Sequence, residues 1–408
     1  MERMISEPAR QIPVRESFDV AVCGGGIAGI SAALAAARNH RKVVLLEREF
    51  LLGGLATAGL ITIYLPLCDG NGKQVSFGIA EELLRFSVRH GYEGKARGYD
   101  AWVSGEKPED RVKNRFEVQY NPQVFALDAE QLLRENGVEI RYGIAVCAVQ
   151  TEKEKITHLI TESKSGRTAI AVKSVVDCTG DADVARQSGE KTTCFSQGND
   201  LAAWYYSVEN GKNQLNMVGC LDVPELNHGP KAPKPIFNEK FFGLDVVKNS
   251  RQMCLSHEQI LKHYLEKGRV GDTYSLATVP TILQIRMTRR LVGRYEMDDG
   301  EMHREFSDSV GMFSDWRKRG PVYELPMRCL YGERVRNLYC AGRNISVRDA
   351  MWDITRVIPV CAVSGQAAGT AAALFPDSRD LSLPRLQQSL RQAGGKLHEG
   401  ELTDASGC

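Results

Sequence analysis

The chain has 408 residues, a length that favours two domains over a single core. Lys and Arg total 52 and Asp and Glu total 51, and the resulting net charge of +1 argues against an overall field that attracts nucleic acid or an anionic membrane. The 11 cysteines form no CxxC pair, the first twenty residues hold no apolar signal core, and no apolar run approaches the roughly 18 residues of a membrane span. We therefore expect a protein of a reducing compartment, the cytoplasm, that contacts neither nucleic acid nor membrane.

Short apolar runs bounded by glycines or charged residues predict buried strands, and longer amphipathic or Ala-rich runs predict helices. The expected strands are residues 18–23, 43–47, 138–142, 145–150, 156–162, 168–173, 175–180 and 337–340. The expected helices are residues 27–39, 79–89, 122–136, 257–267, 283–295, 362–375 and 383–392. The strands at 145–173 follow one another closely, which is typical of a β-meander.

A change of composition divides the chain into two predicted domains. Residues 190–335 are more polar and richer in proline than the strand-and-helix pattern on either side. We assign 16–75, 118–189 and 335–376 to one discontinuous domain, 76–117 and 190–334 to a second domain, and 377–408 to a C-terminal tail.

The first predicted strand ends in the turn Gly24-Gly25-Gly26-Ile27-Ala28-Gly29, which opens the first predicted helix. In a dinucleotide-binding turn Gly24 permits the tight bend, Gly26 lets backbone approach a pyrophosphate, and Gly29 lets helix and strand pack closely. The helix N-terminus adds unpaired N–H groups for the phosphates. Glu47 ends the next strand, where its carboxylate can accept hydrogen bonds from an adenosine ribose. A tight turn with a surface glutamate is the alternative, but the complete strand-turn-helix-strand unit favours a dinucleotide.

Later motifs separate FAD from NAD by resemblance. Arg48 and the string Leu52-Gly53-Gly54-Leu55-Ala56-Thr57 resemble the second glycine pair of the two-dinucleotide-binding flavoproteins. The string Asp177-Cys178-Thr179-Gly180-Asp181-Ala182-Asp183 resembles their strand-ending element beside FAD, and Cys340-Ala341-Gly342-Arg343 resembles their late flavin-binding turn. Residues 356–372 resemble the closing helix of the FAD-dependent oxidoreductases related to the fumarate reductase and succinate dehydrogenase flavoproteins.

This resemblance covers roughly residues 18–375. It implies an α/β protein with a doubly wound, Rossmann-like FAD domain that carries a β-meander insertion, and a second α+β domain that forms a substrate site or cap. It also implies non-covalent FAD held by Gly24, Gly26, Ile27, Ala28, Gly29, Glu47, Arg48, Gly53, Gly54, Ala56, Thr57, Val146, Thr179, Gly180, Asp181, Gly342, Arg343, Val360 and Cys361. The N-terminus of the closing helix, near Val360 and Cys361, is expected to stabilise negative charge on the reduced flavin.

Three arginines are the candidate catalytic residues. On the helix expected at 283–295, Arg286, Arg290 and Arg294 share a face, and the related family carries a similar arginine run. Arg286 or Arg290 is expected to clamp a substrate carboxylate or to donate a proton, and a basic solvated face or structural ion pairs are the alternative. Arg356 has the best position for the active site by resemblance, whereas Arg343 is expected either to bind FAD or to tie the cofactor loop to the sheet.

These features predict an FAD-dependent oxidoreductase that transfers a hydride between a small organic substrate and flavin N5. The chain lacks a second GxGxxG unit, so an external electron donor or acceptor is expected to complete the reaction. Two alternatives stay open: a flavoprotein that uses FAD for hydration or isomerisation, and an FAD-binding protein without catalysis. The sequence predicts no metal site, and it fixes neither the substrate nor the oligomeric state.

Overall fold

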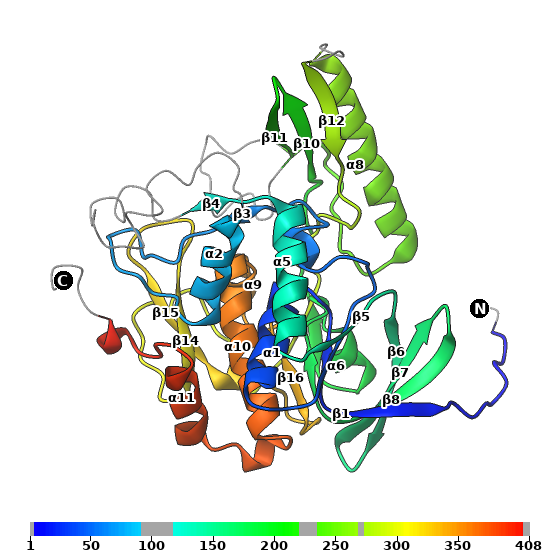
Figure 1. The fold of residues 1–408 in the computed structure, drawn as a ribbon, viewed down its shortest axis with the longest axis vertical. Coiled ribbons are helices and arrows are strands. Elements are labelled where there is room, and N and C mark those ends of the chain that lie inside the picture. Colours follow the sequence, from blue (N-terminus) through cyan, green and yellow to red (C-terminus); the bar gives the residue numbers. More distant parts are fainter. Residues whose placement is uncertain (1–3, 91–116, 220–234, 268–272, 403–408) are drawn as a thin grey trace.

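A seven-stranded mixed sheet lies at the centre of the computed structural model, which describes residues 4–90, 117–219, 235–267 and 273–402 (Figure 1). The parallel part has the order β5-β2-β1-β8-β16, and β6 and β7 continue antiparallel from the first half of β8. Its strands are β1 (Val14–Cys23), β2 (Val43–Leu46), β5 (Glu139–Arg141), β6 (Ala145–Glu152), β7 (Lys155–Ser163), β8 (Gly166–Asp177) and β16 (Leu338–Cys340). The α/β fold with a doubly wound sheet and a β-meander is confirmed.

The sheet is covered on both faces, as the apolar runs require. In β1, Val20 and Val22 face a core shared with several helices, whereas Ala21 and Cys23 face a second core under the β-meander and α6 (Asp183–Gln187). The helices of the first core are α1 (Ile27–Arg38), α2 (Ile79–Arg89), α5 (Pro122–Glu135) and α10 (Ile358–Leu374), together with α9 (Asp349–Thr355) and α11 (Leu383–Gln392).

Helices α1 and α10 cross at very short range. A Cβ added at Gly365 would lie 2.4 Å from the carbonyl oxygen of Ala28, and one at Gly369 would lie 2.2 Å from that of Ala32. Both glycines therefore let the first and the last long helices of the fold touch through their backbones. The shorter α9 (Asp349–Thr355) precedes α10 and meets it at a bend of 91°.

A smaller sheet and a long helix form an extension that stands away from the central sheet, at the upper right of Figure 1. The sheet has the order β11-β10-β12, and α8 packs on one of its faces through a core that includes Tyr205 and Ile260. The elements are α8 (Val246–Glu266), β10 (Ala203–Glu209), β11 (Lys212–Val218) and β12 (Tyr274–Thr278).

Short elements complete the described fold. Three strand pairs connect distant segments: β3 (Ile63–Tyr64) with β4 (Val118–Gln119), β9 (Thr192–Cys194) with β13 (Arg289–Leu291), and β14 (Ser309–Ser314) with β15 (Val322–Pro326). The last helix is α11 (Leu383–Gln392). Residues 91–116 and 220–234 of the expected second domain, and 403–408 of the expected tail, lie outside the described residues.

Several sequence expectations need correction. The helix expected at 283–295 is wrong, because this segment has no helix and contributes β13 instead. The two strands expected at 168–173 and 175–180 are one strand, β8, which ends at Asp177. The intervening Ser174 stays in the ladder opposite Val20 of β1, and its buried hydroxyl donates to the carbonyl of Ala372. Helix α8 begins eleven residues before the expected position 257, and α10 begins at Ile358 because Pro359 fits the first turn of a helix.

Candidate functional site

Four parallel strands end in register at one edge of the sheet, and the loops that follow them line one cavity. Cys23 of β1 lies opposite Leu46 of β2 and Asp177 of β8, and Asp177 lies opposite Cys340 of β16. The cavity has a volume of about 320 Å³, within the usual range for small-molecule and cofactor pockets. It extends along the edge where ligands of open α/β sheets bind.

The three glycines of the first turn have different roles. Gly24 has φ +102°, and a Cβ there would lie 2.4 Å from the carbonyl oxygen of Cys178. A Cβ at Gly29 would lie 1.8 Å from the carbonyl oxygen of Gly24, so this position sets the contact between helix and strand. A Cβ at Gly26 would have no atom within 4 Å, and Gly26 lines the cavity. The backbone at Gly26 is therefore open to a ligand.

The N-terminus of α1 and a second glycine turn lie side by side at the cavity. Gly26 is the N-cap of α1 and provides no side-chain cap, so the first N–H groups of the helix are available for an anion. Gly53 donates its N–H to the carbonyl of Gly25 over 2.8 Å, and Gly53 and Gly54 have φ +100° and +55°. This pairing holds the Gly53–Gly54 turn against the first turn.

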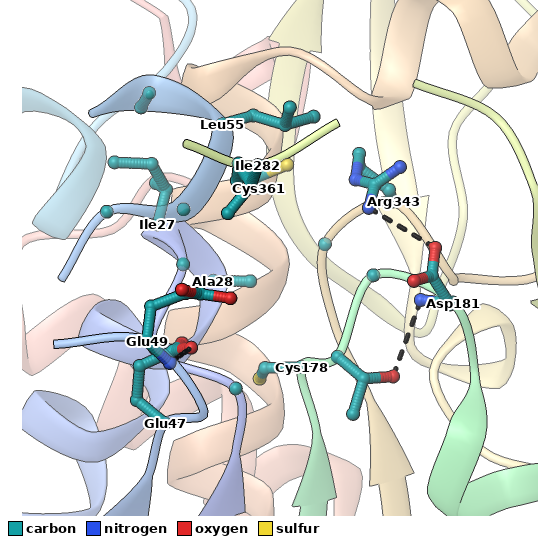
Figure 2. Close-up of a pocket in the computed structure, with 18 of the residues that line it drawn as sticks. Ile27, Ala28, Glu47, Glu49, Leu55, Cys178, Asp181, Ile282, Arg343 and Cys361 are labelled. Carbon is teal, nitrogen blue, oxygen red and sulfur yellow. Dashed lines mark hydrogen bonds and ion pairs between the residues drawn. The ribbon is translucent and has the colours of Figure 1, made fainter. Parts of the chain in front are cut away.

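The carboxyl group of Glu47 is held by two backbone donors at one end of the cavity (Figure 2). The N–H of Gly25 donates to Oε2 over 2.6 Å, and that of Glu49 donates to Oε1 over 2.9 Å. Burial raises the pKa of Glu47, although these two hydrogen bonds oppose the shift. Each oxygen keeps a further lone pair, which suits a ligand hydroxyl.

Asp181 connects the loop after β8 to two distant segments. Its Oδ1 accepts hydrogen bonds from the hydroxyl of Thr288 at 2.6 Å and from Nη2 of Arg343 at 3.3 Å, the latter shown in Figure 2. Arg343 also donates to the backbone carbonyls of Arg286 at 2.6 Å and Ile285 at 3.2 Å. Arg343 therefore links the loop after β8 to residues 285–286 while it lines the cavity, and its role in FAD binding stays a prediction.

Asp183 begins α6 directly after this loop and lines the cavity on the side of Arg48. Burial and the neighbouring Asp181 and Asp177 raise the pKa of Asp183 to about 6, and the guanidinium of Arg289 opposes that rise. Arg289 donates to Asp183 Oδ1 at 2.5 Å and to the carbonyl of Asp181 at 2.9 Å. Arg289 of β13 thus holds this loop and the start of α6 in place.

The other end of the cavity is lined mostly by apolar side chains, with Arg286, Arg356 and Asn249 among its polar ones. Arg286 is buried, and its guanidinium lies 5.2 Å from the centre of the Trp204 ring. Arg356 donates Nε and Nη2 to Asp353 Oδ1 at 3.0 and 2.7 Å, and its guanidinium lies over Trp316. The apolar lining residues at this end include Ile61, Ile63, Leu65, Leu283, Ile285, Val357 and Ile358.

Most of the site residues predicted from the sequence line this one cavity. They are Gly24, Gly26, Ile27, Ala28, Glu47, Arg48, Gly53, Gly54, Ala56, Val146, Thr179, Gly180, Asp181, Gly342, Arg343, Cys361, Arg286 and Arg356. Gly29, Thr57 and Val360 are buried nearby but do not line it: Gly29 contacts Gly24, and the Thr57 hydroxyl donates to the carbonyl of Leu52. Burial raises the pKa of the Cys361 thiol to about 12, so this cavity-lining group is a neutral thiol at neutral pH.

The expected shared face of Arg286, Arg290 and Arg294 is wrong, because the segment is extended. Arg290 does not line the cavity: it donates to Glu296 at 2.8 Å and its guanidinium lies 5.6 Å from the Trp352 ring centre. Arg294 points elsewhere, to Glu333 and the Tyr331 ring.

Three cavity-lining residues around β3 were not predicted from the sequence: Ile61, Ile63 and Leu65. Their spacing of two residues, with Thr62 and Tyr64 buried between them, is the pattern that identifies one face of an extended segment.

The geometry fits FAD. An open backbone at Gly26, a helix N-terminus and a buried carboxylate form a site for an adenosine diphosphate group, and the apolar end suits a flat ring system.

The model of the family "FAD dependent oxidoreductase" matches residues 19–205 and 238–390. The chain belongs to this family. The enzyme is therefore an FAD-dependent oxidoreductase, and its cofactor is FAD. The predicted membership of the FAD-dependent oxidoreductases is confirmed.

Individual relatives are distant. A thioredoxin reductase of Ureaplasma parvum serovar 3 is 29% identical over 79 residues, which are 19% of this chain and 26% of that protein. A geranylgeranyl bacteriochlorophyll reductase-like structure from Thermoplasma acidophilum matches with 15% identity and a TM-score of 0.47 over 92% of this chain and 83% of that one. A flavocytochrome c3 fumarate reductase matches with 15% identity and a TM-score of 0.42 over 89% of this chain and 79% of that one.

Within the described ranges, no single helix is long and apolar enough to cross a membrane. Only α9 and α10 counted together reach that length and composition, and they are bent by 91°. The same ranges contain no group of three or more His, Cys, Asp or Glu side chains arranged to hold a metal ion. The cytoplasmic location stays a prediction.

Proposed function

We propose that the enzyme transfers a hydride between a small organic substrate and FAD, with the substrate bound at the apolar end of the cavity beside Arg286 and Arg356. The observation that carries this proposal is one continuous cavity with dinucleotide-binding features at one end and, at the other, Arg286 and Arg356 among mostly apolar side chains. When bound, FAD supplies a ring that accepts or gives a hydride at N5.

The two arginines would orient the substrate. Arg286 is nearly fully buried against Trp204, so its guanidinium presents a fixed, always charged donor to an anionic or carbonyl group. Arg356 shares its charge with Asp353, which holds its Nε and Nη2 in place. The surrounding apolar side chains exclude water and strengthen both interactions.

The start of α10 would stabilise negative charge at the same end of the cavity. Val357 is its N-cap and gives no side-chain cap, and both Val357 and Ile358 line the cavity. The unpaired N–H groups of the first turn and the helix dipole favour an anion there. Because α9 meets α10 at 91°, the helix begins at the cavity instead of running past it.

Two further parts of the proposal concern domains and partners. Residues 16–75, 118–189 and 335–376 would form the FAD domain, and 76–117 with 190–334 would form the substrate or cap domain. An external donor or acceptor, which binds transiently, would complete the electron transfer. Hydration or isomerisation is the less favoured alternative, because the family is one of oxidoreductases.

The test is an anaerobic screen of the purified, FAD-loaded enzyme against organic acids, alcohols and carbonyl compounds, followed by the flavin absorbance. A substrate should bleach the oxidised flavin or reoxidise the reduced flavin. Arg286→Gln should slow this step or raise KM, whereas Arg294→Gln, from the same segment but outside the cavity, should leave it unchanged. A dithionite-reduced enzyme that no acceptor reoxidises would contradict the proposal.

A further inference from the structure

Helix α8 carries apolar side chains along its exposed face. Val247 is 74% exposed, and Leu261 and Leu265 are each 56% exposed. Cys254, also exposed, lies seven residues from both Val247 and Leu261. At 3.6 residues per turn these four side chains form one row along the helix, which we call the α8 stripe. The helix lies at the outer edge of the extension in Figure 1.

The opposite face of α8 packs on the small sheet and its surroundings with both apolar and polar side chains, the apolar ones including Leu255, Ile260 and Tyr264. The fully buried residues of this face are Gln252, Ser256 and Ile260, which point about 180° away from Cys254 around the helix axis. Ser256 donates to the carbonyl of Ala202, and Gln252 Oε1 is buried without a hydrogen-bond partner. A helix on a protein surface normally buries its more apolar face. The stripe adds a second apolar row on the face that such a helix normally leaves polar, which indicates that the stripe is itself a contact surface.

We propose that the α8 stripe binds the α8 stripe of a second copy of this chain in antiparallel orientation, with the twofold axis at Cys254. In this register Val247 of each copy lies opposite Leu261 of the other, since both are seven residues from Cys254. Leu265 then lies near Leu244 of the other copy, which is 38% exposed just before α8. Each apolar residue of the stripe therefore meets an apolar partner.

The charges beside the stripe favour this orientation over the parallel one. Arg251 and Glu258 flank the stripe on the same side and are both exposed, with the Arg251 side chain 61% exposed while it contacts Glu239 at 3.2 Å. In the antiparallel pair the twofold axis is perpendicular to the helices, so the charged sides of both copies lie on the same edge of the contact. Arg251 of each copy then lies beside Glu258 of the other, which gives two such charge pairs. In a parallel pair the two charged sides lie on opposite edges and these charges do not meet.

The size of the contact sets the expected strength. A helix of 21 residues is about 31 Å long at 1.5 Å per residue. One helix pair of this length buries less than the roughly 800 Å² per partner of a standard interface. We therefore expect a reversible dimer whose population depends on protein concentration.

Sedimentation velocity and thiol cross-linking of the FAD-loaded enzyme test the proposal. The wild type should shift from monomer to dimer with concentration, and a short bismaleimide linker should join Cys254 to Cys254 of the second copy. The cross-link should disappear in Cys254→Ser and persist in Cys147→Ser, which removes another exposed thiol. Leu261→Glu should abolish the dimer while it leaves the flavin absorbance unchanged, which shows that the variant is folded.

A charge exchange separates self-association from any other use of this surface. Arg251→Glu and Glu258→Arg should each weaken the dimer roughly tenfold, because each change places like charges together twice. The double variant should recover the wild-type association. A monomer at every concentration, a dimer that Leu261→Glu leaves intact, or a double variant no stronger than the single ones would overturn the proposal.

Discussion

Two glycines of the first turn, three residues apart, should respond to alanine in opposite ways. In Gly29→Ala the new Cβ lies 1.8 Å from the carbonyl oxygen and 2.9 Å from the carbonyl carbon of Gly24, both backbone atoms. Neither can rotate away, so α1 must move off β1. Overpacking of this kind costs about 1–3 kcal/mol or more of unfolding free energy.

In Gly26→Ala the new methyl group meets no protein atom within 4 Å. Gly26 has φ −68° and ψ −175°, which alanine adopts without strain. The loss of a glycine N-cap costs up to about 1 kcal/mol, and the smaller entropy of the unfolded chain returns about 0.4–1 kcal/mol. The stability of the apoprotein should therefore change little.

The FAD affinity of Gly26→Ala should fall sharply, because the methyl group occupies the space through which a pyrophosphate approaches the helix N-terminus. Loss of one hydrogen bond to a charged group is worth about 1.5–3 kcal/mol, which is roughly 10- to 150-fold in Kd. Urea unfolding of the apoproteins and FAD titration by flavin fluorescence give the two quantities. A Gly26→Ala protein with the wild-type Kd, or a Gly29→Ala apoprotein as stable as wild type, would refute the reasoning.

Three other substitutions test the site and its support. Glu47→Gln should weaken FAD binding roughly tenfold to a hundredfold. Burial raises the pKa of Glu47, and ribose hydroxyls bind its ionised form, so the FAD affinity of the wild type should decline on acidification at a higher pH than it would for an exposed glutamate. FAD titrations across pH should show this decline in the wild type and not in Glu47→Gln. Arg290→Ala should lower the free energy of unfolding by about 3 kcal/mol, which is the lower end for a broken buried ion pair because the Glu296 side chain is 36% exposed. The variant should retain kcat/KM per bound FAD. A loss of kcat/KM in a stable variant would return Arg290 to the active site. Gly369→Ala should lower the Tm because it separates α10 from α1. The control Gly400→Ala should not lower the Tm, since no atom lies within 4 Å of its new Cβ. Equal Tm values for the two variants would show that the close crossing is dispensable.

The central sheet and the dinucleotide end of the site were predictable because local signals agree with the global fold. Buried apolar runs, a glycine turn and an acidic residue at a strand end each require only their own segment to be recognised. The register of Cys23, Leu46, Asp177 and Cys340 then brings those segments together without further information.

The substrate end was predicted less well, because long-range contacts decide its structure. Residues 283–295 have a helical spacing of arginines, but Thr288 and Arg289 are used to bind the loop at Asp181 and Asp183. These contacts and the pairing of β13 with β9 outweigh a helical preference of a few tenths of a kcal/mol per residue. The small sheet β10–β12 was missed for a related reason: its strands pair across segments that no local pattern connects.

The backbone contact of α1 with α10 has a consequence for how the enzyme is made. The first residues of the cofactor site are synthesised early, but Gly365 and Gly369 pack on α1 only after nearly the whole described chain has emerged from the ribosome. Strand β16, which completes the parallel sheet beside β8, arrives just before. Until then α1 lacks the packing partner that α10 provides, and the cavity lacks the wall that α10 supplies. We therefore expect FAD to bind only after α10 has been synthesised, and a chain that stops before α10 to be unable to hold the cofactor.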